Sequence, residues 1–254
     1  MDPLDQKKCR VLIVDNNGDL RAGLATELTG FGLSVTMAAG REKALELEQQ
    51  SDFELLISDL TNQDVSGNGE VVRSFKLSVT NSPVRCEVRA FHDIIERTLS
   101  FKSQRIDKSQ ATIPVREKID LELPSDLTLM NSVLEYLLDR VEKLGLVEIE
   151  QSNLFVALDE AFVNAVKHGN RNDPQKLVRV TAELSAREAI FTVEDEGDGF
   201  DVREIPDPTD PANLFKSTGR GVLLIYNIMD EVEYSRGGAK LKMVKRPEGS
   251  ALVT

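Results

Sequence analysis

The chain has few cysteines and no apolar segment long enough to cross a membrane. Only two cysteines, Cys9 and Cys86, occur in its 254 residues. They are too few for a disulfide framework or a zinc site. The longest apolar runs, such as Val11 to Val14, fall far short of the roughly 20 residues that a transmembrane helix needs. The stretch from Met1 to Arg10 is polar and lacks the apolar core of a signal peptide, so we expect a cytoplasmic protein.

Positive charge is also in short supply. Lys and Arg total 31 against 43 Asp and Glu, which gives a formal net charge of -12. Such a chain repels phosphodiester backbones and anionic lipid surfaces, so we expect no direct binding to nucleic acid or to a membrane. Hydrophobic residues make up 41% and charged residues 29% of the chain, which is typical of a globular protein. The length favours two compact domains.

In the first half, apolar β-branched runs alternate with segments of helical spacing. The pattern predicts strands at Arg10 to Asp15, Leu33 to Ala38 and Phe53 to Ser58, and helices at Asp19 to Leu28 and Arg41 to Gln50. Alternating strands and helices predict an α/β domain with a doubly wound parallel sheet.

The boundary between the halves is less regular. The polar stretch Thr61 to Glu70 is predicted to be a loop, and the four-three spacing of apolar residues from Val84 to Lys102 predicts a long helix. We therefore expect one domain over residues 8–83 and a helical connector over residues 84–110. The pattern leaves open whether this helix instead completes the first domain, which would then extend to about residue 110.

The second half, residues 115–248, is predicted to be an α+β domain. Strands are expected at Lys118 to Leu123, Val178 to Leu184, Ala189 to Val193, Val232 to Tyr234 and Leu241 to Val244, and helices from Pro124 to Gly145, from Glu150 to Lys167 and from Gly221 to Met229. The proline-containing segment Asp201 to Thr218 has no periodicity and is expected to form a loop of lid length.

Three short motifs in this half favour nucleotide binding. Glu160, Asn164 and His168 are spaced by four residues, which places them along one face of the predicted helix. The sequence Asp-Glu-Gly-Asp-Gly begins at Asp195 directly after a strand, and Gly219-Arg220-Gly221 opens the next helix. Glycines at such positions let backbone N–H groups approach phosphate oxygens. Each motif alone is a weak indication, because the Asp-Glu-Gly-Asp-Gly sequence is also typical of an ordinary acidic turn and Gly-Arg-Gly before a helix is more often a simple helix start.

Taken together and in this order, the motifs resemble those of the Bergerat-fold ATPases of the gyrase, chaperone and histidine-kinase superfamily. The matching segments are Glu160 to Asn170, Asp195 to Asp201 and Gly219 to Ile225. Within that superfamily, the stretch from Lys118 to Arg246 is most similar to the bacterial anti-sigma factor serine kinases. The resemblance implies a mixed sheet covered by helices on one face. It also implies a kinase that transfers the γ-phosphate of ATP to a serine or threonine of an anti-sigma factor antagonist, with binding of a sigma factor as a further expectation.

The resemblance also implies roles for individual residues. Glu160 would be the general base that accepts a proton from the attacking hydroxyl, Asn164 would hold Mg²⁺, and Asp195 would accept the adenine amino group. The expected ATP-binding residues are Asn164, His168, Asp195, Gly197, Gly199, Lys216, Ser217, Thr218, Gly219, Arg220, Gly221 and Val222. Magnesium is expected because the segment Glu194 to Asp210 carries eight acids and one Arg, so the protein itself does little to offset triphosphate charge.

Two other functions remain open. Sensor histidine kinases share the resembled fold, but they need an acceptor histidine on a separate helical hairpin, and His92 is the only histidine outside the second domain. A non-catalytic anti-sigma or partner-binding module would use ATP only to fix its shape. The resembled kinases contact their partner through a basic residue on the first helix of the domain, where this chain has Met130 and Asn131, so the identity of the partner is open.

The first half resembles a response-regulator receiver, most clearly from Arg10 to Gly69. Asp59 matches the phospho-acceptor position, and Asp15 matches one acid of the Mg²⁺-binding pair, whereas the adjoining acid is replaced by Asn16. The same features are compatible with a pseudo-receiver used for docking or dimerisation. The stripe on the Val84 to Lys102 helix favours a homodimer.

Overall fold

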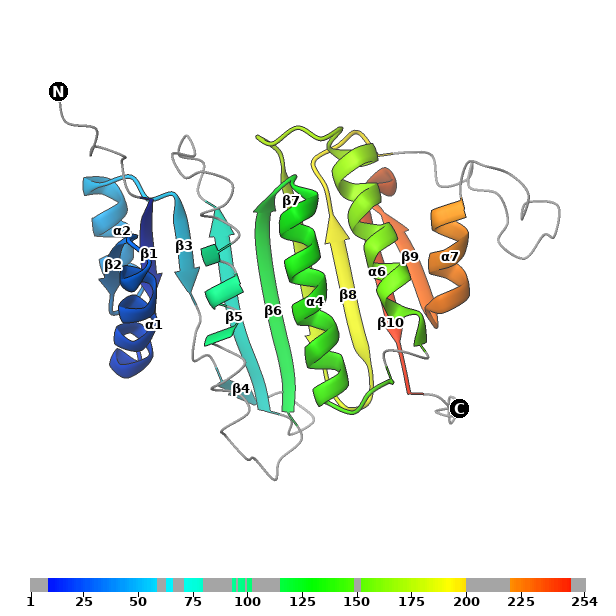
Figure 1. The fold of residues 1–254 in the computed structure, drawn as a ribbon, viewed down its shortest axis with the longest axis horizontal. Coiled ribbons are helices and arrows are strands. Elements are labelled where there is room, and N and C mark those ends of the chain that lie inside the picture. Colours follow the sequence, from blue (N-terminus) through cyan, green and yellow to red (C-terminus); the bar gives the residue numbers. More distant parts are fainter. Residues whose placement is uncertain are drawn as a thin grey trace. The chain divides into compact units, whose positions relative to one another are not determined.

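The structure is a computed structural model that divides into two compact units, Met1–Thr112 and Ile113–Thr254. It describes residues 9–58, 63–65, 71–79, 93–94, 96–98, 100–101, 115–148, 152–199 and 220–247. Each unit is described separately below (Figure 1).

The N-terminal unit contains three parallel strands in the order β2-β1-β3: β1 (Arg10–Val14), β2 (Ser34–Ala38) and β3 (Leu55–Ser58). Helix α1 (Gly18–Gly30) joins β1 to β2, and α2 (Arg41–Gln50) joins β2 to β3. Val11, Leu12 and Ile13 are all fully buried. Because successive side chains of a strand point to opposite faces, both faces of β1 are covered. The alternation predicted from the sequence is therefore present in these five elements.

Beyond β3, the prediction of a parallel sheet is wrong, because the strands that follow pair in the antiparallel direction. Strand β5 (Val71–Val79) pairs with β3 in the antiparallel direction, and the short strand β4 (Gln63–Val65) pairs antiparallel with β5. The predicted loop from Thr61 to Glu70 thus contains a strand. A parallel return would need a crossover connection of a dozen or more residues, usually a helix, and the polar sequence between β3 and β5 provides no helical pattern.

Part of the predicted Val84 to Lys102 helix is described. Residues 93–94, 96–98 and 100–101 are helical, whereas His92 lies outside the described residues. Ile94 and Thr98, which lie one turn apart, are both buried, and the Thr98 hydroxyl donates to the Ile94 carbonyl at 2.8 Å. The guanidinium of Arg97 lies 2.9 Å from the centre of the Phe31 ring at the end of α1. Cys9, at the start of the unit, is buried and disulfide-bonded, which the sequence analysis did not foresee.

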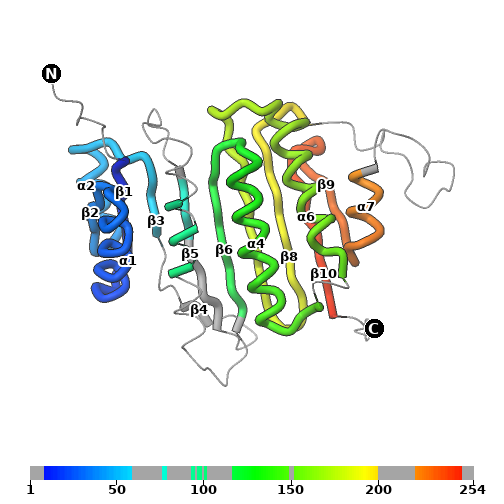
Figure 2. Tube along the Cα trace, viewed as in Figure 1, coloured from blue at the N-terminus to red at the C-terminus, as the bar shows by residue number. Residues whose placement is uncertain are grey.

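The C-terminal unit is a sheet in the order β6-β7-β8-β10-β9 (Figures 1 and 2). Its strands are β6 (Val115–Pro124), β7 (Leu177–Leu184), β8 (Ala189–Glu194), β9 (Glu231–Ser235) and β10 (Lys240–Lys245). The pairings described within this unit are antiparallel, whereas β1 pairs with β2 and β3 in the parallel direction in the N-terminal unit. An antiparallel sheet can keep one face in water, and β7 alternates between buried and half-buried residues accordingly.

Helices cover the other face of this sheet. They are α4 (Leu127–Lys143), α6 (Leu154–Val163) and α7 (Arg220–Ile228), and α6 packs against both α4 and α7 (Figure 1). Asp126 caps α4 by accepting the Thr128 backbone N–H at 2.7 Å. The helices on one face of a sheet agree with the α+β architecture expected for this half. No helix in the described ranges combines the length and apolarity that a membrane crossing requires.

A buried ion pair joins α4 to β6. Arg140 and Glu117 are each 2% exposed, and the guanidinium donates to both carboxylate oxygens, at 3.0 and 2.7 Å. This two-point geometry leaves neither buried charge uncompensated, because each carboxylate oxygen receives an N–H. The pair joins the last turns of α4 to the first residues of β6.

Candidate nucleotide site

The helix that carries Glu160 and Asn164 changes its winding between these two residues. Helix α6 ends at Val163, and a π-helix runs from Asn164 to Gly169. The backbone N–H of Asn170 donates to the Ala165 carbonyl five residues earlier, at 2.8 Å. Single turns of π-helix are rare and are frequently found at functional sites. The sequence analysis expected a regular helix here and did not foresee this change.

The Glu160 carboxylate lies against the start of α7. Gly221, in the first turn of α7, is so close that a Cβ atom at this position would overlap the Glu160 carboxylate. Glu160 is half-buried and accepts no hydrogen bond from any described residue, so its oxygens are available to a ligand. The packing of α6 on α7 thus brings the predicted base to the predicted second glycine motif.

Asn164 offers an oxygen ligand one turn beyond Glu160. Its side chain is half-buried and forms no hydrogen bond with another described residue. The described residues contain no cluster of three or more His, Cys, Asp or Glu side chains that would hold a metal by themselves. A single amide fits Mg²⁺ in a nucleotide site, because this ion is commonly held by one or two protein oxygens together with substrate phosphates and water.

Asp195 lies at the end of β8 and is 8% exposed. Burial raises the pKa of its carboxyl group, and the Gly197 backbone N–H, which donates to Oδ1 at 2.8 Å, together with the positive charges of Lys176 and Arg236, opposes that rise. The Asp195 backbone N–H donates to the Ala239 carbonyl at 3.0 Å. A buried, oriented carboxylate of this kind can accept a hydrogen bond from an amino group.

Glycines surround Asp195 because the backbone passes too close for side chains. A Cβ at Gly169 would overlap the Asp195 carboxylate, and one at Gly197 would overlap the Gly169 carbonyl. A Cβ at Gly199, which has a φ of 73°, would overlap the Gly237 carbonyl in the turn between β9 and β10. Three segments far apart in the sequence therefore converge here, and their contact depends on the absence of Cβ atoms.

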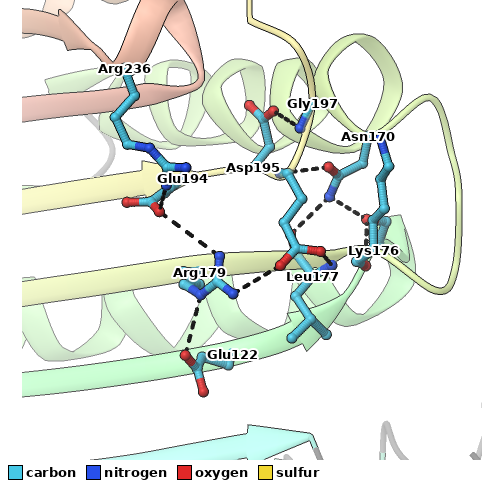
Figure 3. Close-up of polar contacts among 11 residues, drawn as sticks. Glu122, Asn170, Lys176, Leu177, Arg179, Glu194, Asp195, Gly197 and Arg236 are labelled. Carbon is cyan, nitrogen blue, oxygen red and sulfur yellow. Dashed lines mark hydrogen bonds and ion pairs between the residues drawn. The ribbon is translucent and has the colours of Figure 1, made fainter. Parts of the chain in front are cut away.

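A network of ion pairs supports this loop from the open face of the sheet (Figure 3). Arg179 on β7 binds Glu196 at 2.8 Å and Glu122 on β6 at 3.3 Å. Glu194, the last residue of β8, pairs with Arg236 and, at 3.4 Å, with Lys240. These contacts connect the end of β8 and the segment that follows it to β6, to β7, to β10 and to the turn between β9 and β10.

The predicted site residues divide into four groups. Glu160, Asn164, Asp195, Gly197, Gly199 and Gly221 lie on the converging segments described above. His168 is exposed on the π-helix, Val222 is half-buried in α7, and Arg220 is the first residue of α7. Lys216, Ser217, Thr218 and Gly219 lie outside the described residues, as does Asp59 of the first unit. Asp15 is buried at the end of β1, and its Oδ1 accepts the Asn17 backbone N–H at 2.7 Å.

Sequence reasoning assigned no role to two residues of the site, Gly169 and Asn170, although both end the first motif of the resemblance. Both lie within the motif that begins at Glu160, but they fall outside its four-residue spacing. Asn170 is fully buried, and the Asp195 carboxylate packs against the α-carbon of Gly169. A glycine followed by an amide at a helix end reads as an ordinary helix stop, so no local signal distinguishes the pair.

Gly221 provides a test of the site geometry. We expect Gly221→Ala to leave the protein folded, because the group that the new methyl would meet is the movable end of the Glu160 side chain. The displaced carboxylate should lower the rate of the phosphoryl transfer that the sequence resemblance predicts by about 10²-fold, a cost that misplacing a reacting group by about 1 Å can have. Gly30→Ala is the control, since a Cβ there meets no atom within 4 Å. Unchanged transfer in Gly221→Ala would show that Glu160 and Gly221 do not work together.

Residues 123–245 match the family model described as "Histidine kinase-like ATPase domain". The chain is 36% identical over 87 residues to the anti-sigma F factor of Shouchella clausii (33% of this chain, 59% of the relative). It is 29% identical over 106 residues to the serine-protein kinase RsbW of Staphylococcus epidermidis (39% of this chain, 65% of the relative). It is 31% identical over 102 residues to the anti-sigma F factor of Anoxybacillus flavithermus (38% of this chain, 69% of the relative).

The chain spans about three fifths of the length of the first two relatives, 59% and 65%, and its similarity to them covers about a third of its own length. The coverage of the Anoxybacillus flavithermus protein is greater, at 69%. The chain therefore belongs to the family of the anti-sigma F factors, and residues 123–245 form its histidine kinase-like ATPase domain.

Proposed function

We propose that the protein is a serine/threonine kinase that transfers the γ-phosphate of ATP to an anti-sigma factor antagonist. The observation that carries this proposal is the position of Glu160: a half-buried carboxylate, one helical turn before Asn164, held against the first turn of α7. The names of the relatives, serine-protein kinase and anti-sigma F factor, support the same reaction and the same class of partner. Binding of a sigma factor is part of the proposal.

In this proposal the adenine ring and the phosphates of ATP are bound at opposite ends of the site. Asp195 accepts the adenine amino group, with room provided by Gly169, Gly197 and Gly199. The N-terminus of α7 faces the phosphates, where backbone N–H groups favour negative charge. Asn164 holds Mg²⁺, which offsets phosphate charge when bound. His168, Lys216, Ser217, Thr218, Gly219, Arg220 and Val222 are proposed to complete the nucleotide contacts.

The transfer step requires a base near the attacking hydroxyl. The hydroxyl oxygen of the partner's serine or threonine bonds to the γ-phosphorus, and Glu160 takes the proton of that hydroxyl. The bond from the γ-phosphorus to the bridging β-phosphate oxygen breaks, and ADP leaves. A positioned carboxylate typically contributes about 10² to 10⁴-fold to such a reaction.

Incubation of the purified chain with γ-labelled ATP, Mg²⁺ and candidate antagonist proteins tests the function. Acid-stable label on a partner serine or threonine is the expected result. Acid-labile label on His92 would instead identify a histidine kinase. Tight ATP-dependent binding of the partner without label would identify a non-catalytic anti-sigma module.

We propose further that the N-terminal unit is a receiver-like regulatory domain and that the protein acts as a homodimer. The order β2-β1-β3 and the buried Asp15 at the end of β1 support a receiver-like start. The antiparallel β5 and the replacement of the second acid by Asn16 favour a pseudo-receiver that docks a partner. The alternative is a true receiver in which Asp59 accepts a phosphoryl group.

Treatment with acetyl phosphate distinguishes these two forms of regulation. For a true receiver, we expect an added phosphoryl mass on the wild type that is absent from Asp59→Asn. We also expect a changed kinase rate or a change of about 5- to 150-fold in the dimerisation constant, the usual range of coupling between sites. For a pseudo-receiver, mass, rate and dimer fraction should all remain unchanged. Light scattering before and after treatment gives the dimer fraction, and a purely monomeric protein in both states would contradict the homodimer.

A further inference from the structure

Asn170 occupies the centre of the polar contacts beneath the glycine loop. Its side chain is fully buried, and each of its polar atoms has a partner. Nδ2 donates to Ser125 Oγ at 2.7 Å and to the Leu177 carbonyl at 2.9 Å. Oδ1 accepts the Glu196 backbone N–H at 2.7 Å (Figure 3). One amide therefore connects the turn before α4, the start of β7 and the loop that follows β8.

The contact with Glu196 bears directly on Asp195. The peptide that joins Asp195 to Glu196 is held by Asn170 at its N–H, and the preceding peptide is held by the Ala239 carbonyl. Both peptides that flank the Asp195 α-carbon are thus pinned. Gly169, the residue before Asn170, lies against the carboxylate itself. Asn170 therefore fixes the position of the Asp195 backbone, and Gly169 limits the position of its carboxylate.

The π-helix explains how Asn170 reaches this position. The N–H of Asn170 bonds to Ala165 rather than to Val166, and Asn172 donates to the Val166 carbonyl at 2.8 Å. The wider turn changes the direction in which the chain leaves the helix. The next two residues, Arg171 and Asn172, have φ values of 58° and 57°, in the left-handed region that non-glycine residues rarely adopt. Such backbone persists where the surrounding contacts hold it in place.

We infer that Asn170 is a positioning residue for nucleotide recognition, which holds Asp195 at the distance and angle needed to select adenine over guanine. The inference rests on the proposed role of Asp195. Asn170 is fully buried, and its two N–H donors and its oxygen each have a protein partner, so it acts through Asp195 and does not touch the nucleotide. Removing the amide should loosen the loop and reduce base selectivity more than it reduces phosphate binding.

The test compares the affinities of the full chain for ATP and GTP by calorimetry in the presence of Mg²⁺. In Asn170→Ala we expect the ratio of ATP to GTP affinity to fall about tenfold, the effect of one hydrogen bond. Ser125→Ala removes only one of the three amide contacts, and we expect a fall of about two- to threefold. Val180→Ala, which removes buried volume from β7 without touching the amide, is the control and should keep the wild-type ratio.

The outcomes separate the inference from the function on which it rests. A wild type that does not prefer ATP over GTP would contradict the role of Asp195, and with it the proposed adenine site. A wild type that prefers ATP, together with an unchanged ratio in folded Asn170→Ala, would overturn the positioning role alone. If Asn170→Ala does not fold, the ratio in Ser125→Ala decides. A change there larger than in Val180→Ala supports the inference, and an equal ratio overturns it.

Discussion

Replacing Glu160 by Gln should lower phosphoryl transfer to the partner by about 10² to 10⁴-fold, while ATP affinity stays close to that of the wild type. The amide keeps the size of the side chain and its place against Gly221, but it cannot take the proton of the attacking hydroxyl. Single-turnover transfer of labelled phosphate measures the chemical step, and calorimetry measures ATP binding separately.

Asp159→Asn is the matched control for this experiment. Asp159 is the neighbouring carboxylate on α6 and is also half-buried, so its loss changes the charge of the helix by the same amount. We expect it to leave transfer within a few-fold of the wild type. Equal losses in the two variants would indicate a general effect of charge on the site, and unchanged transfer in Glu160→Gln would assign the base to another group.

Replacing Asp195 by Asn should weaken ATP binding and at the same time stabilise the folded protein. If the NH₂ group of the new amide faces the adenine amino group, two donors meet and no hydrogen bond forms. If the amide oxygen faces it, the hydrogen bond lacks the negative charge that strengthens it. A hydrogen bond to a charged group contributes about 1.5 to 3 kcal/mol, so ATP affinity should fall roughly 10- to 150-fold. Asp198→Asn in the same loop is the control, because the Asp198 side chain is 88% exposed.

The gain in stability follows from the direction of the pKa shift. Burial raises the pKa of Asp195 in the folded protein, so the folded state retains this proton to a higher pH than the unfolded chain does. The free energy of unfolding of the wild type therefore falls as the pH rises through the interval between the unfolded and folded pKa values. Asn carries no such cost and should be more stable than Asp above that interval.

Denaturant titrations across this pH range measure the effect. Above the folded pKa, we expect a higher unfolding midpoint for Asp195→Asn than for the wild type, and the difference should vanish below the unfolded pKa. ATP affinity of the wild type should decline as the pH falls through the raised pKa, because the protonated carboxyl is a weaker acceptor. A stability difference that does not depend on pH would show that ionisation of Asp195 is not its cause.

The sequence determined the parts of this protein that depend on neighbours along the chain. The alternation of strand and helix from Arg10 to Ser58, the helix over Glu160 and the strand before Asp195 all follow from periodic burial, which is visible in a short window. The order of the motifs was sufficient to place the second half in its superfamily. Roles for Glu160, Asn164 and Asp195 came from that resemblance.

Only the tertiary structure decided which of these segments meet. Asn170 and Ser125 are 45 residues apart in the chain and become hydrogen-bonded partners only when β6, α4 and the π-helix pack together. The contact of Gly221 with Glu160 likewise arises from the packing of α7 on α6. The reversal of β5 depends on its pairing with β3, and the π-helix on contacts made at its end. These features are determined by interactions between distant residues, whose energies leave no periodic pattern in the sequence.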